Sequence, residues 1–192
     1  VHIQDPLTNR EAFDLIVAPE HDHLHGPNIV STKGALHKVT LQKLAEGVKR
    51  HHSLFHDLPR PYSTVLLGGI TNRYKMPREA IHDLIQQILF IREITQGSVL
   101  VTPSFRTPFR HILTKALENE PHVFLTDLET LNPYFAMLGV ADYVFVTDDS
   151  VNMVCEACVT GKPVYILPLL DHADTKPKQF IQSLVQKGVV RV

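Results

Sequence analysis

Two sets of reactive residues overlap in the segment 147–167, TDDSVNMVCEACVTGKPVYIL. The pair Cys155-x-x-Cys158 has the spacing of a redox or metal-binding motif. The second set is Asp149, Ser150 and Glu156, which are residue types that hold a nucleotide where a strand gives way to a helix. The two interpretations require different chemistry from the same helix.

The surroundings of the two cysteines favour a structural role. A redox pair places its first cysteine at a helix N-terminus, where the helix dipole lowers the thiol pKa. Here Ser150 is the expected N-cap, so Cys155 lies more than one turn inside the helix. A zinc site needs two further ligands at suitable spacing, and the chain has no third cysteine. We predict that Cys155 and Cys158 are buried and inert, and we predict no metal site.

The second set lies at the carboxyl end of a predicted strand, YVFVT (143–147). In an open parallel sheet, ligands bind outside the carboxyl ends of the strands, beside helix N-termini that attract anions. Asp149 and Ser150 occupy this position, although Ser150 alone is equally typical of a simple helix cap. Glu156 lies on an otherwise apolar helix, where a carboxylate is costly unless it is paired. We therefore predict that Glu156 binds the two hydroxyls of a ribose.

Two other strand ends carry similar loops. In LLGGITNRY (66–74), Gly68 and Gly69 allow close approach of the backbone to a ligand, and polar donors for phosphate follow. In VTPSFRTP (101–108), polar residues again follow a strand. The donors expected in the two loops are Thr71, Asn72, Arg73, Ser104 and Arg106. Together, the three strand ends predict a ligand that bears phosphate.

Histidines gather in PEHDHLHGPN (19–28) and again at His51-His52. His21, His23 and His25 alternate and are able to ligate a metal on an extended segment. We favour a solvated loop, or a general base facing a cleft, because no second cluster supplies further ligands. The His51-His52 pair is predicted to lie at the surface.

Composition narrows the function classes. The chain has 192 residues, 44% of them hydrophobic, and a formal net charge of −1. No run of Lys and Arg suggests a nucleic-acid partner, and no apolar run approaches the ~20 residues that span a bilayer. Two cysteines cannot form a disulfide framework, so a reducing, cytoplasmic compartment is expected. The sequence implies no cofactor.

The elements that must position these residues follow a strand–helix alternation from residue 64 onward. Continuously apolar runs predict strands at 64–67, 98–102, 123–125, 143–147 and 164–167, with a last short strand at 189–192. Helical periodicity occupies 81–89, 109–117 and 180–185. This alternation predicts an α/β domain with a doubly wound, Rossmann-like parallel sheet.

The first 55 residues have a different pattern. Three short apolar runs, VHIQ, FDLIVAP and NIVST, predict strands with little room for helices between them, and one helix is expected at 38–55. Such a set cannot bury a core of its own. We therefore expect residues 1–55 to be the closing portion of an N-terminal Rossmann-like domain, 56–63 a linker and 64–192 the C-terminal nucleotide-binding domain.

Several segments resemble the mitochondrial fission family named for the elongated-mitochondria protein of plants, including its bacterial members, which were long catalogued as a domain of unknown function. They are GPNIVSTKGALHKV, LLGGITNRYKM, PSFRTP, ADYVFVTDDSVNMVCEACVTGKPVYIL and FIQSLVQKGVVRV. The resemblance implies a two-domain fold like that of B-fold glycosyltransferases. It also implies that Glu156 holds the ribose, that Ser150 and 68–73 hold the diphosphate, and that His37 faces the cleft. The sequence departs from the family at Pro177, where members usually have an aromatic residue.

Two functions are compatible with this resemblance. The first is binding of a nucleotide-diphosphate sugar, with transfer or epimerisation of the sugar. Arg73 and Arg106 would then stabilise the departing diphosphate without a metal, and Asp22 or His37 would act as the catalytic base. The alternative is a non-catalytic adaptor that recruits a protein partner, as the plant relative recruits a dynamin-type GTPase, with peripheral membrane association left open. The polar loops and Glu156 favour the first function.

Overall fold

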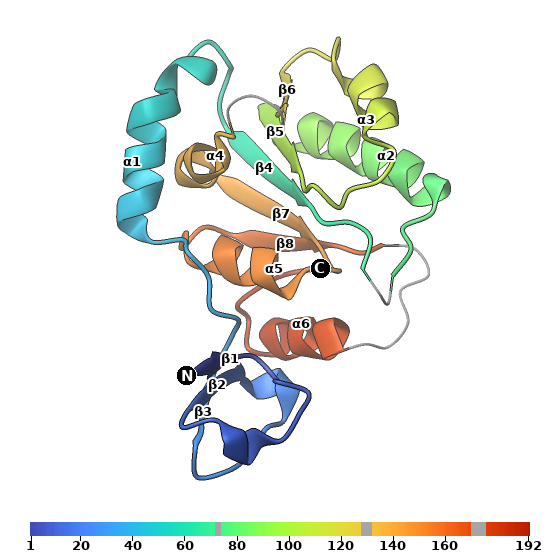
Figure 1. Ribbon diagram of the computed structural model, residues 1–192. Helices are drawn as coiled ribbons and strands as arrows, with labels where there is room; N and C mark the ends of the chain where they lie inside the picture. The colour runs from blue at the N-terminus through green and yellow to red at the C-terminus, as the bar shows by residue number, and fades with distance from the viewer. Residues whose placement is uncertain (72–73, 128–131, 170–175) are drawn as a thin grey trace.

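The computed structural model describes residues 1–71, 74–127, 132–169 and 176–192. Within these residues the chain forms two parallel sheets, one of three strands near the N-terminus and one of five strands (Figure 1). Helices cover both faces of the larger sheet, and the small sheet lies beyond α6 (Lys176–Gln186). The fold is the mixed α/β class that the sequence predicts.

The larger sheet consists of β4 (Tyr62–Leu67), β5 (Ser98–Pro103), β6 (Val123–Leu125), β7 (Tyr143–Thr147) and β8 (Val164–Leu167). Every pair is parallel, and the order is β6-β5-β4-β7-β8. These five predicted strands are confirmed, with β4 beginning two residues earlier than expected. Because the first strand is central, the direction of winding reverses between β4 and β7. This reversal is the topological switch point, beside which ligands bind in open α/β sheets.

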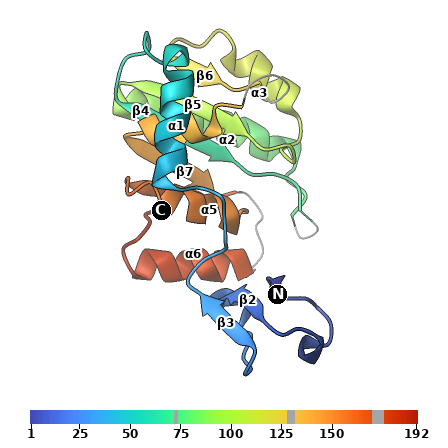
Figure 2. The same cartoon turned by 60° about the vertical axis from the view of Figure 1, so that its left-hand side comes forward.

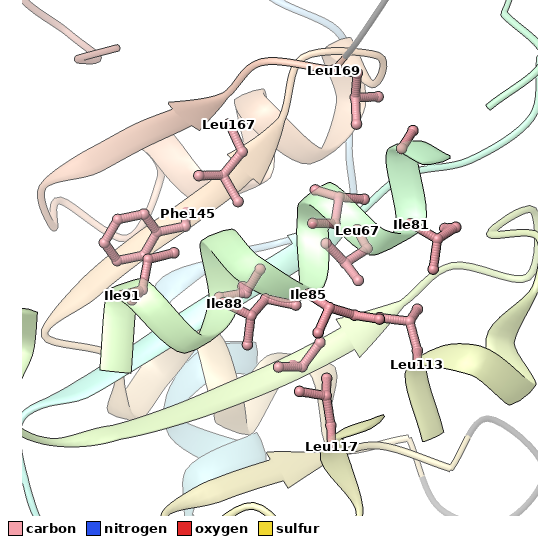
Figure 3. Packing of buried hydrophobic residues seen from close by; sticks show 14 of the residues in the cluster. Leu67, Ile81, Ile85, Ile88, Ile91, Leu113, Leu117, Phe145, Leu167 and Leu169 are labelled. Carbon is pink, nitrogen blue, oxygen red and sulfur yellow. The ribbon is translucent and has the colours of Figure 1, made fainter. Parts of the chain in front are cut away.

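Alternating side chains of the strands face two helical layers. Val65 and Leu67 face α2 (Arg78–Thr95) and α3 (Arg110–Leu117), and Figure 3 shows the α2 residues Ile81, Ile85 and Ile88 in this layer. Leu66 faces the opposite layer, which contains α4 (Tyr134–Val140), α5 (Val151–Cys158) and α6. Both faces of the sheet are therefore buried, which explains why its strands are continuously apolar.

The smaller sheet consists of β1 (His2–Ile3), β2 (Ile16–Pro19) and β3 (Ile29–Thr32), all parallel. Only the short 3-10 turns η1 (Arg10–Ala12) and η2 (Glu20–Asp22) lie between them. The buried cluster there contains Ile16, Ala18 and Leu24. The three predicted strands are confirmed, and they bury this small cluster although they were expected to bury no core of their own.

Helix α1 (Leu41–His51) leaves the smaller sheet and packs against α4, so that it lies along the outside of the larger unit (Figures 1 and 2). A further 3-10 turn, η3 (His52–Leu54), follows it. Leu44 and His51 lie two turns apart on the same helix face, and both are buried. The prediction that His51 lies at the surface was therefore wrong, because seven-residue spacing places it on the packed face with Leu44. The division into 1–55, 56–63 and 64–192 stays a prediction, and α1 packs on the second part.

Two local features differ from the sequence interpretation. Helix α4 was not predicted, because its sequence YFAMLGV is apolar throughout and shows no helical period. The predicted last strand is reduced to one parallel bridge between Arg191 and Tyr165, with hydrogen bonds from Arg191 N to Val164 O and from Ile166 N to Arg191 O.

The close contact between α1 and α4 depends on two glycines. A Cβ atom on Gly47 would lie 2.8 Å from Ala136 N, and one on Gly139 would lie 2.6 Å from Val48 Cγ2. We predict that Gly47→Leu lowers the free energy of unfolding by about 1–3 kcal/mol through overpacking, which outweighs the gain of about 0.8 kcal/mol in helix propensity. Urea unfolding measures the difference. Ala45→Leu, at an exposed position of the same helix, is the control, and equal stabilities of the two variants would contradict the prediction.

Candidate functional site

The switch point is held together by a network around Asp149. The carboxylate of Asp149 accepts hydrogen bonds from Gly69 N at 2.7 Å and from Thr147 Oγ1 at 2.6 Å. Thr147 Oγ1 in turn accepts from Gly68 N at 2.8 Å. Asp149 is only 6% exposed. The ends of β4 and β7 are therefore joined by side-chain hydrogen bonds as well as by the sheet.

Glycine is required at both positions of the β4 loop. A Cβ atom on Gly68 would lie 2.2 Å from the carboxylate oxygens of Asp149, and one on Gly69 would lie 2.1 Å from the carbonyl oxygen of Arg106. These glycines were expected to allow close approach of the backbone to a ligand. Their N–H groups donate to Thr147 and Asp149 instead, so the close approach is to the neighbouring loops.

The β5 loop is fixed against the same point. Thr107 Oγ1 donates to the carbonyl oxygen of Gly68 and accepts from Ser104 N at 2.9 Å. Ile70 N donates to the carbonyl oxygen of Arg106 at 2.9 Å, while the side chain of Arg106 is exposed. The loops after β4, β5 and β7 thus form one hydrogen-bonded rim.

The structure brings most of the predicted phosphate residues to this rim. Gly68, Gly69, Ser104, Arg106 and Asp149 belong to it through the contacts above. Thr71 lies in the same loop as the glycines, where its Oγ1 accepts from Tyr74 N at 3.0 Å. Asn72 and Arg73 lie outside the described residues. The assignment of these residues to a nucleotide site stays a prediction.

Ser150 is the N-cap of α5, and its Oγ accepts from Met153 N at 3.5 Å. The capping role is therefore confirmed, and Ser150 is buried at the positive end of the helix dipole. The rim and the N-terminus of α5 adjoin through Asp149 and Ser150.

Glu156 has a partner that the sequence did not reveal. Glu156 Oε2 accepts a hydrogen bond of 2.5 Å from Tyr134 Oη, so a carboxylate on α5 is tied to the first residue of α4. Burial, then the nearby carboxylate and the hydrogen bond to it, raises the pKa of Tyr134. The phenol is therefore the donor. Within the part of the chain that the structure describes, Oε1 of Glu156 has no hydrogen-bond partner.

A cavity of about 610 Å³ separates the N-terminal strands from α5 and α6. His37 lines this cavity, whereas Asp22, on η2, is half-buried and is not among the lining residues. Both candidate bases therefore belong to the N-terminal part of the chain, and of the two only His37 lines the cavity. Of the histidine cluster, His21 and His23 line the cavity, and His25 is exposed.

The cysteines have the environment of structural thiols. Cys155 is buried, as predicted, and its Sγ accepts from Ala35 N at 3.3 Å, whereas Cys158 was also predicted to be buried and is only partly so. Burial raises the pKa of both thiols, and it raises that of Cys158 to about 11 with a further contribution from Cys155. Among the described residues no group of three or more His, Cys, Asp and Glu side chains is arranged to hold a metal ion.

Comparison with known proteins identifies relatives over the whole chain. The family model described as "Mitochondrial fission ELM1" matches residues 1–192. The mitochondrial fission protein ELM1 of Arabidopsis thaliana is 31% identical over all of this chain and 50% of its own length. An uncharacterised protein of Rickettsia prowazekii is 28% identical over 90% of this chain and 49% of its own length. The chain thus spans about half the length of the curated relatives it matches.

A solved structure shares the fold. The UDP-GlcNAc 2-epimerase of Methanocaldococcus jannaschii, determined in complex with UDP-GlcNAc and UDP, superposes with a TM-score of 0.59 at 16% identity. The match covers 93% of this chain and 50% of the epimerase chain. The chain therefore has a glycosyltransferase-B-like fold over the half of the epimerase that it covers. No helix in the described ranges has the length and apolar character needed to cross a membrane.

The clamp formed by Asp149 gives a stability prediction. Asp149→Ala removes the acceptor for Gly69 N and Thr147 Oγ1 in a buried place, so we expect the free energy of unfolding to fall by about 1–3 kcal/mol. Asp149→Asn keeps one acceptor oxygen, so its free energy of unfolding should lie between those of the wild type and the alanine variant. Chemical denaturation measures the three proteins. An alanine variant as stable as the wild type would show that the clamp contributes nothing.

The raised thiol pKa of Cys158 gives a pH prediction. A thiol reacts as the thiolate, so alkylation of Cys158 by iodoacetamide should increase about tenfold per pH unit up to pH ~10 and level off only near its pKa of about 11. At pH 8 the thiolate fraction is about 100-fold below that of a thiol with the ordinary pKa of 9.0. Peptide mass spectrometry reports the rate, the denatured chain is the control, and a plateau below pH 9 would contradict the assignment.

Proposed function

The chain belongs to the Mitochondrial fission ELM1 family, and we propose that it binds a nucleoside diphosphate sugar at the switch point between β4 and β7. The diphosphate lies at the N-terminus of α5, and the ribose lies against Glu156. Transfer or epimerisation of the sugar is the chemistry that such binding would serve.

The observation that carries the proposal is the state of Glu156. A half-buried carboxylate lies on a helix whose buried residues are Val154, Cys155 and Ala157. Tyr134 satisfies one of its oxygens and so fixes its orientation. The other oxygen is an acceptor suited to a hydroxyl donor of a ligand. Vicinal ribose hydroxyls are donors of this type, and a carboxylate distinguishes them from phosphate by charge.

The N-terminus of α5 supplies the complementary anion site. Free N–H groups and the helix dipole favour negative charge at such an end, and the hydroxyl of Ser150 lies there. Glu156 follows Val151, the first helical residue, by five positions, which is about 8 Å along the axis at 1.5 Å per residue. That spacing is compatible with a ribose and its attached phosphates. The exposed guanidinium of Arg106 is available on the rim.

The chemistry proposed for the bound sugar requires groups from the N-terminal side. His37 and Asp22 remain the candidate bases, and they lie on the segments that follow β3 and β2. The epimerase that shares the fold was crystallised with UDP-GlcNAc and UDP, which supports a nucleotide-sugar ligand for this fold.

A non-catalytic adaptor is the second candidate, and one surface feature favours it. Phe105 is 77% exposed on the β5 loop, and Phe109 and Ile70 are exposed beside it. Ile70 is tied to this loop through its hydrogen bond to Arg106. Exposed aromatic and aliphatic side chains on fixed loops are typical of protein contacts. The adaptor would use this surface and would not need Glu156.

The test is a calorimetric titration of the chain with UDP, GDP, ADP and CMP. We expect one of the nucleotides to bind, and we expect Glu156→Ala to weaken that binding by about 1–3 kcal/mol because a charged hydrogen bond is lost. Tyr134→Phe should weaken binding less, since the carboxylate remains but its orientation is no longer fixed.

Glu93→Ala is the matched control, because Glu93 is exposed on α2, which covers the opposite face of the sheet. It should bind the nucleotide as the wild type does. If none of the four nucleotides binds, or if Glu156→Ala binds as tightly as the wild type, the nucleotide proposal fails and the adaptor becomes the better explanation.

A further inference from the structure

The cavity between the N-terminal strands and helices α5 and α6, here the α6 cavity, has none of the described switch-point loop residues in its lining, although the candidate base His37 lines it. Its lining comes from the segments after β2 and β3, from α5, and from α6 with the residues that follow it. We propose that the α6 cavity binds a small amphiphilic anion, with an apolar body and a phosphate or carboxylate head. This proposal does not rest on nucleotide binding at the switch point.

The body of such a ligand would contact an apolar wall. At about 610 Å³ the α6 cavity is within the range of small-molecule sites, ~300–1,000 Å³. The side chains that form the apolar wall are Ala35, Cys155, Cys158, Phe180, Leu184 and Val189. Both thiols have a pKa raised by burial, so the sulfur atoms are uncharged near neutral pH and count as apolar surface.

The wall is fixed in place by close contacts. A Cβ atom on Gly34 would lie 2.7 Å from Cys155 Sγ, and the N–H of Ala35 donates to the same sulfur. The ring centroids of His21 and Phe180 are 4.8 Å apart. The segment after β3 and the turn after β2 are thus both held against the helices, and the cavity is preformed.

The groups around this wall are suited to an anion. Lys33 and Lys187 line the α6 cavity and are exposed, so their ammonium groups can reach a ligand head from the solvent side. Among the described residues that line the cavity, Glu20 is the one carboxylate, so their formal charge is positive even with every histidine neutral. An apolar surface with a cationic rim favours an amphiphile whose head is negative.

His37 supplies a buried polar group beside this wall. Its Nδ1 atom is buried and has no hydrogen-bond partner among the described residues. A buried polar nitrogen without a partner is unfavourable, and as an N–H donor it would be satisfied by a bound anion. Since His37 also lines the α6 cavity, the unpaired nitrogen and the cationic rim point to the same ligand head.

The binding test uses probes that separate the head from the body. Decyl phosphate and decanoate, each below its micelle concentration, are titrated into the chain by calorimetry. Decanol and inorganic phosphate are titrated as the uncharged body and the bare head. We expect the two amphiphilic anions to bind at least tenfold more tightly than either control. The affinities of decyl phosphate and decanoate, compared with each other, show whether the cavity prefers a phosphate or a carboxylate head.

Variants locate the site. Lys187→Ser should reduce the affinity for the amphiphile several-fold, while Lys178→Ser, on α6 but outside the lining, should leave it unchanged. His37→Phe removes the unpaired nitrogen, so it should reduce the affinity at least fivefold and yet melt no lower than the wild type. A structural histidine would give the opposite pattern, with lower melting temperature and unchanged affinity.

Three results would overturn the proposal. Decanol that binds as tightly as decyl phosphate would indicate an apolar cavity without anion recognition. The absence of binding by both amphiphilic anions would show that no such site exists. Displacement of decyl phosphate by a nucleotide, together with weaker decyl phosphate binding in Glu156→Ala, would show that the anion occupies the switch point instead. Failure of nucleotide binding alone would leave the α6 cavity result unaffected.

Discussion

The contact on which the site depends is the approach of three strand ends at the switch point. No side chain fits on Gly68, which lies against the carboxylate of Asp149, or on Gly69, which lies against the backbone of Arg106. The aspartate is buried, and a buried carboxylate is tolerated only when its oxygens are hydrogen-bonded. Gly69 N and Thr147 Oγ1 provide those bonds. The clamp therefore fixes the position of the residue immediately before Ser150, and with it the start of α5 and the register of Glu156.

The sequence predicted the fold well, because the pattern and the physics agree. A parallel sheet covered on both faces requires continuously apolar strands, and all five strands of the larger sheet had that pattern. The apolar pattern did not predict helix α4, because its residues Tyr134–Val140 are also continuously apolar. Periodicity cannot separate a buried strand from a short buried helix. The burial of His51 could not be predicted for a related reason. A histidine at the end of a helix is typical of either face, and only the packing of α1 against α4 shows that this one is buried.

The strand-end loops were predicted in position but not in detail, and their assignment to a nucleotide stays a prediction. The strand-end loops could be located because any open α/β sheet places them on one edge. The hydrogen bonds within these loops could not be predicted, because the N–H groups of Gly68 and Gly69 are equally suited to donate to a phosphate or to a neighbouring side chain. The tyrosine that holds Glu156 lies 22 residues earlier in the chain. Only the packing of α4 beside α5 brings the two together, and the sequence carries no local signal for that contact.

Tyr134 changes the energetics of the proposed ribose site. An unpaired half-buried carboxylate would lose hydration in the free protein and would also have to be ordered when a ligand arrives. The phenol offsets part of the first loss before any ligand binds, since a hydrogen bond to a charged group contributes about 1.5–3 kcal/mol. It also fixes the rotamer of Glu156, so that less side-chain entropy is lost on binding. The raised pKa of Tyr134 keeps the phenol protonated through the physiological range, and the donor is therefore always present. Glu156 is thus preorganised as an acceptor for the proposed ribose hydroxyls.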